Sequence, residues 1–425
     1  MEKQKIQHLT LSFFYLLILA VPIYWIIRGD VDSKKSLAEG RILKGFPSIN
    51  VQNGSITTDI NQQNPEKSDD LFGQILGKAF QRNVEQAASD QFPFRFSGIL
   101  VSKAVDRFSI DLAYALLPDI VIPSDMKSGL YVFRDGSQLI AAPNIFNSET
   151  RIRLEEKAKD LDQLIKANPD VNFYLFYHQK ISDSPYHPLN SYFKTADMGK
   201  TWDYFTSIAP DNLTIGTLML SSLDEDKYFY YRTDHHMNVN GSLYAYNQIY
   251  EILARGYPQI SPKLNTDYVL EFPNLDFLGS YARRSLYPIQ ADKFSVPITT
   301  QPSFEIYKDN QPYQFNQMEE YQAGDYSNLP YENHYGFYYG NNPAPFIDYR
   351  SENGSTRSIL VIGSSYSRPV LPLLAAHYQH VYYLDLRRNK EFSFKEFSMK
   401  NPVDDVLIFA DYSILVNNDI WKINQ

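Results

Sequence analysis

The chain of 425 residues contains no cysteine, which excludes structural disulfides and thiolate metal sites. It also contains no dense run of lysine or arginine, and its net charge of -9 argues against nucleic acid as a partner. Internal repeats are absent as well. The fold therefore depends on packing and polar contacts, and a chain of this length can bury a large core in one elaborated domain or in roughly two to three domains.

Tyrosine, in contrast, is abundant, with 33 Tyr beside 27 Phe. Tyrosine-rich surfaces often contact sugars or cell-wall polymers, and tyrosine also fills the cores of large α/β proteins. The composition alone leaves both interpretations open.

One long uncharged run, residues 9–27, stands near the start of the chain. As a helix it reaches about 28 Å, which is enough to cross a membrane. Tyr24 and Trp25 at its end are typical interface anchors, and no small-residue cleavage site follows. We therefore expect residues 1–28 to form a short cytoplasmic tail and an N-terminal transmembrane helix, an uncleaved signal anchor. A buried core helix is the alternative.

The remainder of the chain divides by composition. Residues 29–67 are rich in Ser, Asn, Gln, Asp and Gly, which predicts a flexible linker. Residues 68–425 are expected to form one domain outside the cytoplasm, because long domains translocate largely regardless of flanking charge. Within it, residues 262–357 are rich in Tyr, Pro, Asn and Gln and lack a long helical pattern. This segment predicts a β-rich insertion or an elaborated loop region.

Apolar, β-branched or aromatic runs alternate with helical patterns along residues 68–425, which predicts an α/β fold with a mostly parallel sheet. The expected strands are 171–177, 214–220, 359–362, 380–386 and 403–410; the expected helices are 97–115, 151–167, 240–255 and 369–378; and 227–232 is expected to be extended. His178, Gln179 and Lys180 follow the first of these strands, at the sheet edge where ligands bind in open α/β sheets.

Ser365 lies in the turn between an expected strand and helix, in the stretch S-I-L-V-I-G-S-S-Y-S-R. A serine at such a turn is lifted out of the sheet, and a helix N-terminus behind it favours a developing oxyanion. Ser365 is therefore a candidate nucleophile. The alternative is a serine that caps an ordinary helix.

Asp234 and His236 can supply the base that a serine nucleophile needs. In an extended backbone, residues two apart point the same way, so the carboxylate can meet the ring of His236 while His235 faces elsewhere. Two other interpretations remain. The group could bind a metal with His235, although no third and fourth ligand of matching spacing is evident, so no metal or other cofactor is expected. Asp234 could also cap the following helix.

Further candidates flank the nucleophile. The turn Gly340, Asn341 and Asn342 precedes the strand that leads to Ser365 and could give an amide donor to an oxyanion hole, although this is also a common turn sequence. Tyr366 and Arg368 directly follow Ser365 and are candidates for oxyanion or substrate binding.

Three motifs in order resemble the DHHW family of bacterial cell-envelope proteins: D-Q-F-P-F-R at 90–95, T-D-H-H at 233–236, and I-L-V-I-G-S-S-Y-S with L-D-L-R downstream, within 359–387. This family is similar to the alginate O-acetylation proteins. The resemblance implies an SGNH hydrolase-like three-layer α/β/α sandwich in permuted order. It also implies that Ser365 is the nucleophile, His236 the base and Asp234 the orienting acid.

Two positions depart from the family pattern. Met237 stands where the family has the tryptophan that names it, and Ser364 precedes the nucleophile where SGNH hydrolases usually have aspartate, which the alginate-type members also lack.

The resemblance implies a membrane-anchored O-acyltransferase, most simply an O-acetyltransferase, acting on an envelope polysaccharide or teichoic-type polymer. Because acetyl-CoA is cytoplasmic, it also implies a multi-span membrane partner that moves the acyl group across the membrane. Two alternatives stay open: a carbohydrate esterase with the same triad, and a non-catalytic glycan-binding or assembly protein on the same scaffold.

Overall fold

The protein is described by a computed structural model. The structure describes residues 35–36, 41–45, 49–52, 55–58, 82, 85–87, 89–91, 95–116, 122–125, 129–132, 137–299, 303–308, 310–313, 330–340, 346–389, 392–401 and 403–417. The expected span, 9–27, lies outside these residues. Among the helices that are described, none combines the length and apolar character that crossing a membrane requires.

The chain divides into two compact units, residues 1–109 and 110–425. In the first, the segment expected to be a linker contains two short antiparallel ladders, β1 (Lys35–Ser36) with β2 (Arg41–Ile42) and β3 (Ile49–Gln52) with β4 (Ser55–Thr58). The helix α4 (Arg95–Leu116) was expected at 97–115 and passes from the first unit into the second.

The second unit is built on an eight-stranded sheet with the order β13-β12-β14-β16-β15-β17-β8-β9. Its strands are β8 (Asn172–His178), β9 (Leu213–Leu218), β12 (Phe304–Lys308), β13 (Gln311–Pro312), β14 (Phe346–Ser351), β15 (Ser358–Ile362), β16 (His380–Leu384) and β17 (Asp405–Ala410). All pairings from β16 to β9 are parallel, and β14, β12 and β13 add to the sheet antiparallel. The predicted mostly parallel α/β sheet is confirmed.

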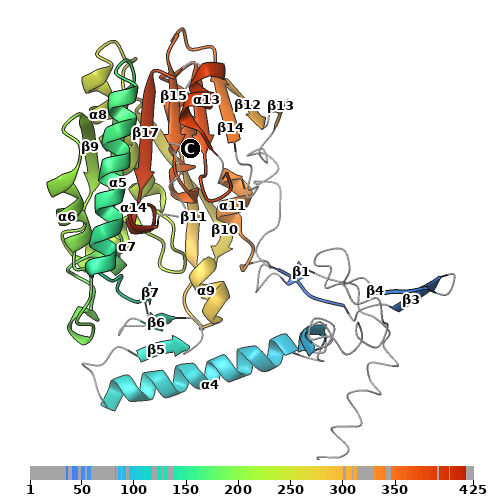
Figure 1. Cartoon of the computed structure of the whole chain (residues 1–425). Helices are drawn as coiled ribbons and strands as arrows, with labels where there is room; N and C mark the ends of the chain where they lie inside the picture. Colours follow the sequence, from blue (N-terminus) through green and yellow to red (C-terminus); the bar gives the residue numbers. More distant parts are fainter. Residues whose placement is uncertain are drawn as a thin grey trace, which may run out of the picture. The chain divides into compact units, whose positions relative to one another are not determined.

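Helices cover both faces of this sheet (Figure 1). Along β8, Phe173 and Leu175 face one layer and Tyr174 and Phe176 the other, because successive strand residues point to opposite faces. The first layer contains α5 (Ser148–Ala167), α6 (Lys200–Ile208), α13 (Phe394–Lys400) and α14 (Tyr412–Val416). The second contains α7 (Leu223–Phe229), α8 (Val239–Gly256) and α12 (Leu371–Leu374). Burial on both faces explains why these strands are almost wholly apolar.

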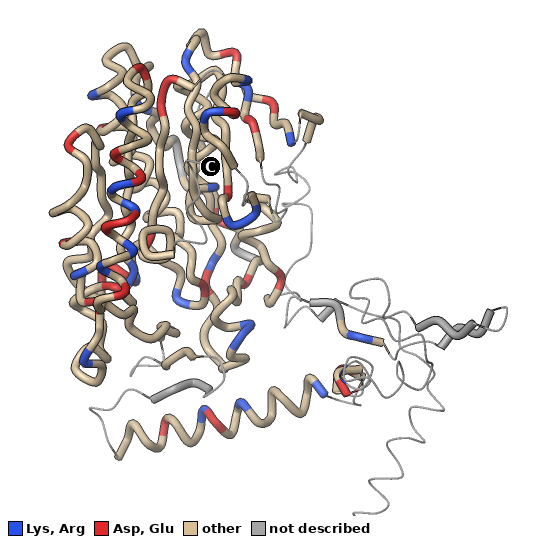
Figure 2. Tube along the Cα trace, in the orientation of Figure 1, with Lys and Arg blue, Asp and Glu red and all other residues tan. Residues whose placement is uncertain are grey.

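The helix α5 shows how the sequence produces this layer. The Asn147 side chain accepts a hydrogen bond from the Thr150 N–H and so caps the first turn. Leu154, Leu161 and Leu164 are buried against the sheet, whereas Figure 2 shows acidic and basic residues interspersed along the helix. The apolar stripe therefore fixes the face that packs. Most of the charges stay in water, but Lys157 is buried and donates to the Ile414 carbonyl at 2.7 Å.

The segment 262–357 is partly what its composition predicts. β10 (Thr266–Phe277) and β11 (Asp292–Thr299) form a separate antiparallel pair, but β12, β13 and β14 extend the main sheet. Two short helices, α9 (Ser280–Ser285) and α11 (His334–Tyr339), lie between these strands. Three further strands precede the main sheet in the chain: β5 (Ile122–Asp125), β6 (Leu130–Val132) and β7 (Leu139–Ala141).

Two local expectations are wrong. Residues 227–229 are helical, because Ser222 caps α7 and acidic residues fill its first turn, which favours a helix over the expected extended strand. Of the helix expected at 369–378, only the four residues of α12 are helical, and a separate 3-10 turn, Ser365–Ser367, precedes them. Pro369 and Pro372 lack the N–H that a longer helix needs.

Gly241, in the first turn of α8, offers a test of this packing. A Cβ at this position would lie 2.3 Å from the carbonyl oxygen of Phe229, at the end of α7. We expect Gly241→Ala to lower the free energy of unfolding by about 1–3 kcal/mol, measured by urea denaturation. The control is Gly98→Ala in α4, where a Cβ meets nothing within 4 Å and alanine favours the helix. Equal destabilisation by both changes would contradict the predicted packing.

Candidate functional site

The candidate residues meet at the edge of the sheet where the parallel strands end. Gly363, Ser364 and Ser365 follow β15 directly, and the loop between α7 and α8 brings Asp234 and His236 to the same edge. A backbone hydrogen bond joins the two sides of that loop, since the Tyr231 N–H donates to the His236 carbonyl at 3.2 Å. This edge is where open α/β sheets bind their ligands.

Three side chains form a continuous hydrogen-bond chain. His236 Nδ1 lies 2.5 Å from Asp234 Oδ1, and His236 Nε2 lies 2.8 Å from Ser365 Oγ. Because an ionised carboxylate only accepts hydrogen bonds, Nδ1 carries the proton and Nε2 accepts the Ser365 hydroxyl. The imidazole therefore has the tautomer that a general base requires. The structure brings together all three residues that the sequence predicted.

The Asp234 carboxylate is buried but well supplied with donors. Its Oδ1 also accepts the His236 N–H at 2.9 Å, and its Oδ2 accepts the Ser280 N–H at 2.5 Å. Burial raises the pKa of Asp234, but the neighbouring imidazoles and these hydrogen bonds outweigh it and hold the pKa well below its usual value. Asp234 therefore remains ionised beside His236.

Asp292 anchors the loop that carries Asp234. Its Oδ2 accepts both the N–H and the hydroxyl of Thr233, at 2.8 and 2.6 Å, and Arg232 contacts its Oδ1. Thr233 Oγ in turn accepts the Gly279 N–H at 3.1 Å. The loop is thus tied to α9 and to β11, both of which belong to the segment 262–357.

His235 also lies at the site, but it does not complete a metal centre. The ligand atoms of Asp234, His235 and His236 lie within 4.8 Å of one another. However, both nitrogens of His236 are already engaged, by Asp234 and by Ser365. His235 Nδ1 lies 2.5 Å from Ser280 Oγ, and burial lowers the pKa of His235 to about 3, so its ring is neutral. The donor set fits a hydrogen-bond relay better than a metal.

The other predicted candidates have different positions. Arg368 donates to the Gly340 carbonyl, so this pair ties the end of α11 to the nucleophile turn. Asn341 and Asn342 lie outside the described residues. Tyr366 is buried, and its ring centroid lies 5.2 Å from that of His236. Its position beside the base is compatible with the predicted binding role.

Lys180 contributes a charge to the same edge. Its ammonium lies 2.8 Å from Asp411 Oδ2 and 3.5 Å from the Tyr366 hydroxyl. Burial opposes the charge, but Asp411 and its neighbours raise the pKa of Lys180 well above its usual value. The ring centroid of His178 lies 4.5 Å from that of Tyr366. These groups hold Tyr366 in place.

Met237, the departure from the family pattern, is a core residue. It is 1% exposed and packs with the apolar cluster around α8, while its neighbour His236 faces Ser365. The residue that departs from the family pattern therefore packs in the core and takes no part in the hydrogen-bond chain.

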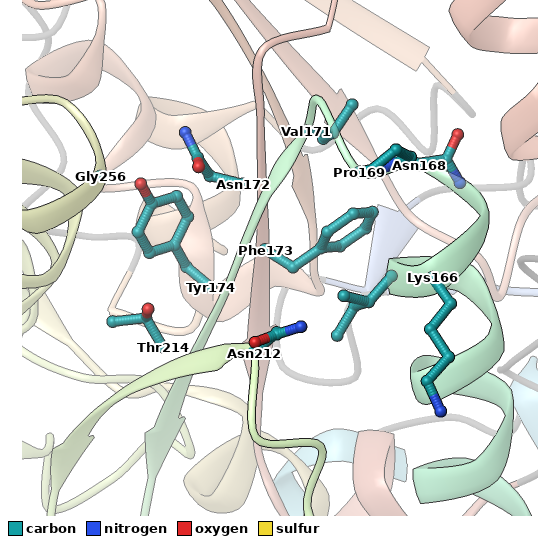
Figure 3. Close-up of a pocket in the computed structure, with 11 residues that line it drawn as sticks. Lys166, Asn168, Pro169, Val171, Asn172, Phe173, Tyr174, Asn212, Thr214 and Gly256 are labelled. Atoms are coloured by element: carbon teal, nitrogen blue, oxygen red, sulfur yellow. The ribbon is translucent and has the colours of Figure 1, made fainter.

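Neither of two cavities lined by described residues includes Ser365 or His236. A cavity of about 280 Å³ lies at the opposite edge of the sheet, where β8 and β9 begin, lined by Asn172, Tyr174, Asn212 and Thr214 among others (Figure 3). Beside Asp234 and His235 there is a cavity of only about 20 Å³, which also reaches Lys180. The side-chain chemistry, rather than the volume, identifies the site.

Gly279, which the sequence analysis did not single out, is required by the approach of α9. A Cβ there would lie 2.2 Å from Asp234 Cβ and 2.4 Å from its Oδ2. We expect Gly279→Ala to slow the reaction of Ser365 with a fluorophosphonate probe by about 10²-fold, because the acid is displaced. Ser280→Ala is the control, since it keeps the backbone N–H on Asp234. A wild-type rate in Gly279→Ala would show that Asp234 does not orient the base.

Comparisons with known proteins bear on the fold. No protein-family model matches the chain, and no curated protein matches it. A solved structure of Bacillus cereus PatB1 with a sulfonyl adduct is 20% identical, with a TM-score of 0.56 over 72% of this chain and 99% of that chain. A DHHW family protein from Eubacterium siraeum is 16% identical, with a TM-score of 0.52 over 71% of this chain and 96% of that chain.

A weaker match, from which we draw no conclusion, is Pseudomonas aeruginosa AlgX, with 13% identity and a TM-score of 0.34 over 66% of this chain and 65% of that chain. The two stronger matches cover nearly the whole of the solved chains. The resemblance seen in the sequence is thereby confirmed at the level of the fold: the chain has the fold of PatB1 and of a DHHW family protein.

Proposed function

We propose that the protein is a membrane-anchored O-acyltransferase of the cell envelope, acting through Ser365, His236 and Asp234. The observation that carries this proposal is the hydrogen-bond chain from Asp234 Oδ1 to Ser365 Oγ, with distances of 2.5 and 2.8 Å. Serine is a weak nucleophile unless a base accepts its proton and a third group orients that base. Each of these roles has a residue at hydrogen-bond distance.

The reaction has two halves. Ser365 Oγ attacks the acyl carbonyl carbon of the donor while its proton passes to His236 Nε2, and the leaving group departs with that proton. An acceptor hydroxyl then gives its proton to His236 and attacks the acyl-serine, which releases Ser365 with its proton restored. Asp234 stays ionised in both halves and stabilises the imidazolium.

The developing oxyanion needs donors. Ser365 and Tyr366 begin a 3-10 turn, so their N–H groups have no partner within the turn, and no other described residue accepts from them. These two amides at the nucleophile are the donors that we assign to the oxyanion hole.

The acceptor that we propose is a hydroxyl of an envelope polysaccharide or teichoic-type polymer, and the acyl group is acetyl. This follows from the resemblance to the DHHW family and from the shared fold. The proposed location is the outer face of the cell membrane, with residues 9–27 as a single span. The donor then comes from a multi-span partner that carries acetyl groups across the membrane.

Labelling tests the nucleophile. A sulfonyl fluoride is suited to this because the PatB1 structure carries a sulfonyl adduct. We expect an aryl sulfonyl fluoride to modify Ser365, with the reaction slowed by at least about 10⁴-fold in Ser365→Ala and His236→Ala. Ser364→Ala is the matched control, since it changes the adjacent serine and should still be labelled. Labelling that is lost in Ser365→Ala would rule out the non-catalytic alternative, whereas labelling that survives this change would contradict Ser365 as the nucleophile.

A glycan acceptor distinguishes acyl transfer from hydrolysis, because only a transferase passes the acetyl group to it. We expect cells that carry Ser365→Ala or His236→Ala to lose the acetyl groups of the modified polymer, because no acyl-serine forms. In vitro, the full chain should pass acetyl from p-nitrophenyl acetate to a glycan acceptor. The measurements are the ester content of the envelope and the division of acetyl between water and glycan. Acetate release that no acceptor diverts would favour the esterase.

A further inference from the structure

Tyr335 contacts both the base and the nucleophile. It lies in α11, within the Tyr-rich segment, and is 2% exposed. Its ring stacks on the imidazole of His236, with centroids 3.8 Å apart and planes at 10°. Its hydroxyl donates to the carbonyl oxygen of Ser365 at 2.8 Å. A single side chain thus contacts both the loop that carries His236 and the turn that carries Ser365.

The stacked ring restrains the imidazole from one face. His236 Nδ1 is held by Asp234 and Nε2 by Ser365, and neither of these hydrogen bonds covers a face of the ring. The rings of His235 and Tyr366 also lie near the imidazole, at 3.9 and 5.2 Å with planes at 37° and 52°, whereas the ring of Tyr335 is nearly parallel to it and so restrains its plane. The electron-rich face of a tyrosine also favours the positive charge that His236 gains when it takes the serine proton.

The hydroxyl acts on the peptide that follows the nucleophile. The Ser365 carbonyl accepts from Tyr335 and, at 3.3 Å, from the Arg368 N–H. The same peptide unit carries the N–H of Tyr366. Because hydrogen bonds in series polarise one another, donors on this carbonyl strengthen that N–H as a donor.

We propose that Tyr335 is a positioning residue that couples the base to the oxyanion hole: its ring fixes the plane of His236, and its hydroxyl orients and polarises the Ser365–Tyr366 peptide. This inference rests on the proposed function. Burial raises the pKa of Tyr335 well above its usual value, so the hydroxyl keeps the proton that it donates.

Two neighbouring tyrosines on α11 allow the contacts of Tyr335 with the site to be compared with packing in the aromatic core. Tyr338 lies one turn along the helix, and its ring contacts Phe272 and Phe294 in the aromatic core, at 6.4 and 5.8 Å. Tyr339 contacts the same core through Phe294. Tyr335 belongs to that core as well, but it alone among these three reaches His236 and Ser365.

The test compares acetyl-enzyme formation from p-nitrophenyl acetate in the full chain and its variants. Tyr335→Phe keeps the ring and removes the hydroxyl, and we expect the acetylation rate constant to fall about three- to tenfold with KM unchanged. Tyr335→Leu also removes the stack and should lose about 10²-fold, so that phenylalanine rescues most of the loss. Tyr338→Phe removes a hydroxyl from the same helix and should keep the wild-type rate.

The possible results distinguish failure of the positioning role of Tyr335 from failure of the proposed function. A wild-type rate in Tyr335→Phe, or an equal loss in Tyr338→Phe, overturns the positioning role while the proposed function stands. A rise in KM with an unchanged rate constant also overturns it, because that pattern indicates lost binding. If Tyr335→Leu does not fold, Tyr335→Phe decides, since it retains the packed ring. A wild-type chain that forms no acetyl-enzyme overturns the proposed function and this inference with it.

Discussion

The buried hydrogen bond between Asp234 and His236 is the interaction on which the rest of the site depends. An ionised carboxylate is costly to bury, and here it is stabilised by the imidazole, the His236 amide and the Ser280 amide. The last of these comes from α9, in the segment 262–357, which approaches closely because Gly279 has no side chain. The segment that looks like an insertion in the sequence is therefore part of the site, and the loop, the sheet and α9 have to fold together before Ser365 meets its base.

The sheet and the central residues of the site could be read from the sequence because their signals are local. Apolar runs such as 359–362 predict buried strands, and the Asp-x-His spacing of 234 and 236 predicts two side chains that share a direction. Tyr335 had no such signal: it is one of 33 tyrosines, and its contact with Ser365 spans 30 positions of chain, which include the strands β14 and β15. Gly279 is likewise defined by a neighbour 45 positions away, which no local pattern encodes.

The nucleophile turn departs from the expected strand-turn-helix in a way that changes how charge is stabilised. The sequence predicted a helix N-terminus behind Ser365, but α12 has only four residues and begins after Val370. So short a helix adds little dipole. Stabilisation of an oxyanion at Ser365 then depends on individual amide N–H groups. The direction of these groups is set by the donors that bind the carbonyl oxygens of the turn. Tyr335 and Arg368 are those donors, which makes α11 and the turn a single polar unit.

Cavity volume and side-chain chemistry point to different places in this molecule. Pockets that enclose small molecules are usually about 300–1,000 Å³. The cavity beside Asp234 and His235 is about 20 Å³, close to the volume that one water occupies, and the cavity of about 280 Å³ lies at the far edge of the sheet. Neither of these two cavities is lined by Ser365 or His236. The site is therefore defined by the contacts of its side chains: the Asp234 carboxylate, the His236 imidazole and the Ser365 hydroxyl lie in one hydrogen-bond chain, which cavity volume alone does not locate.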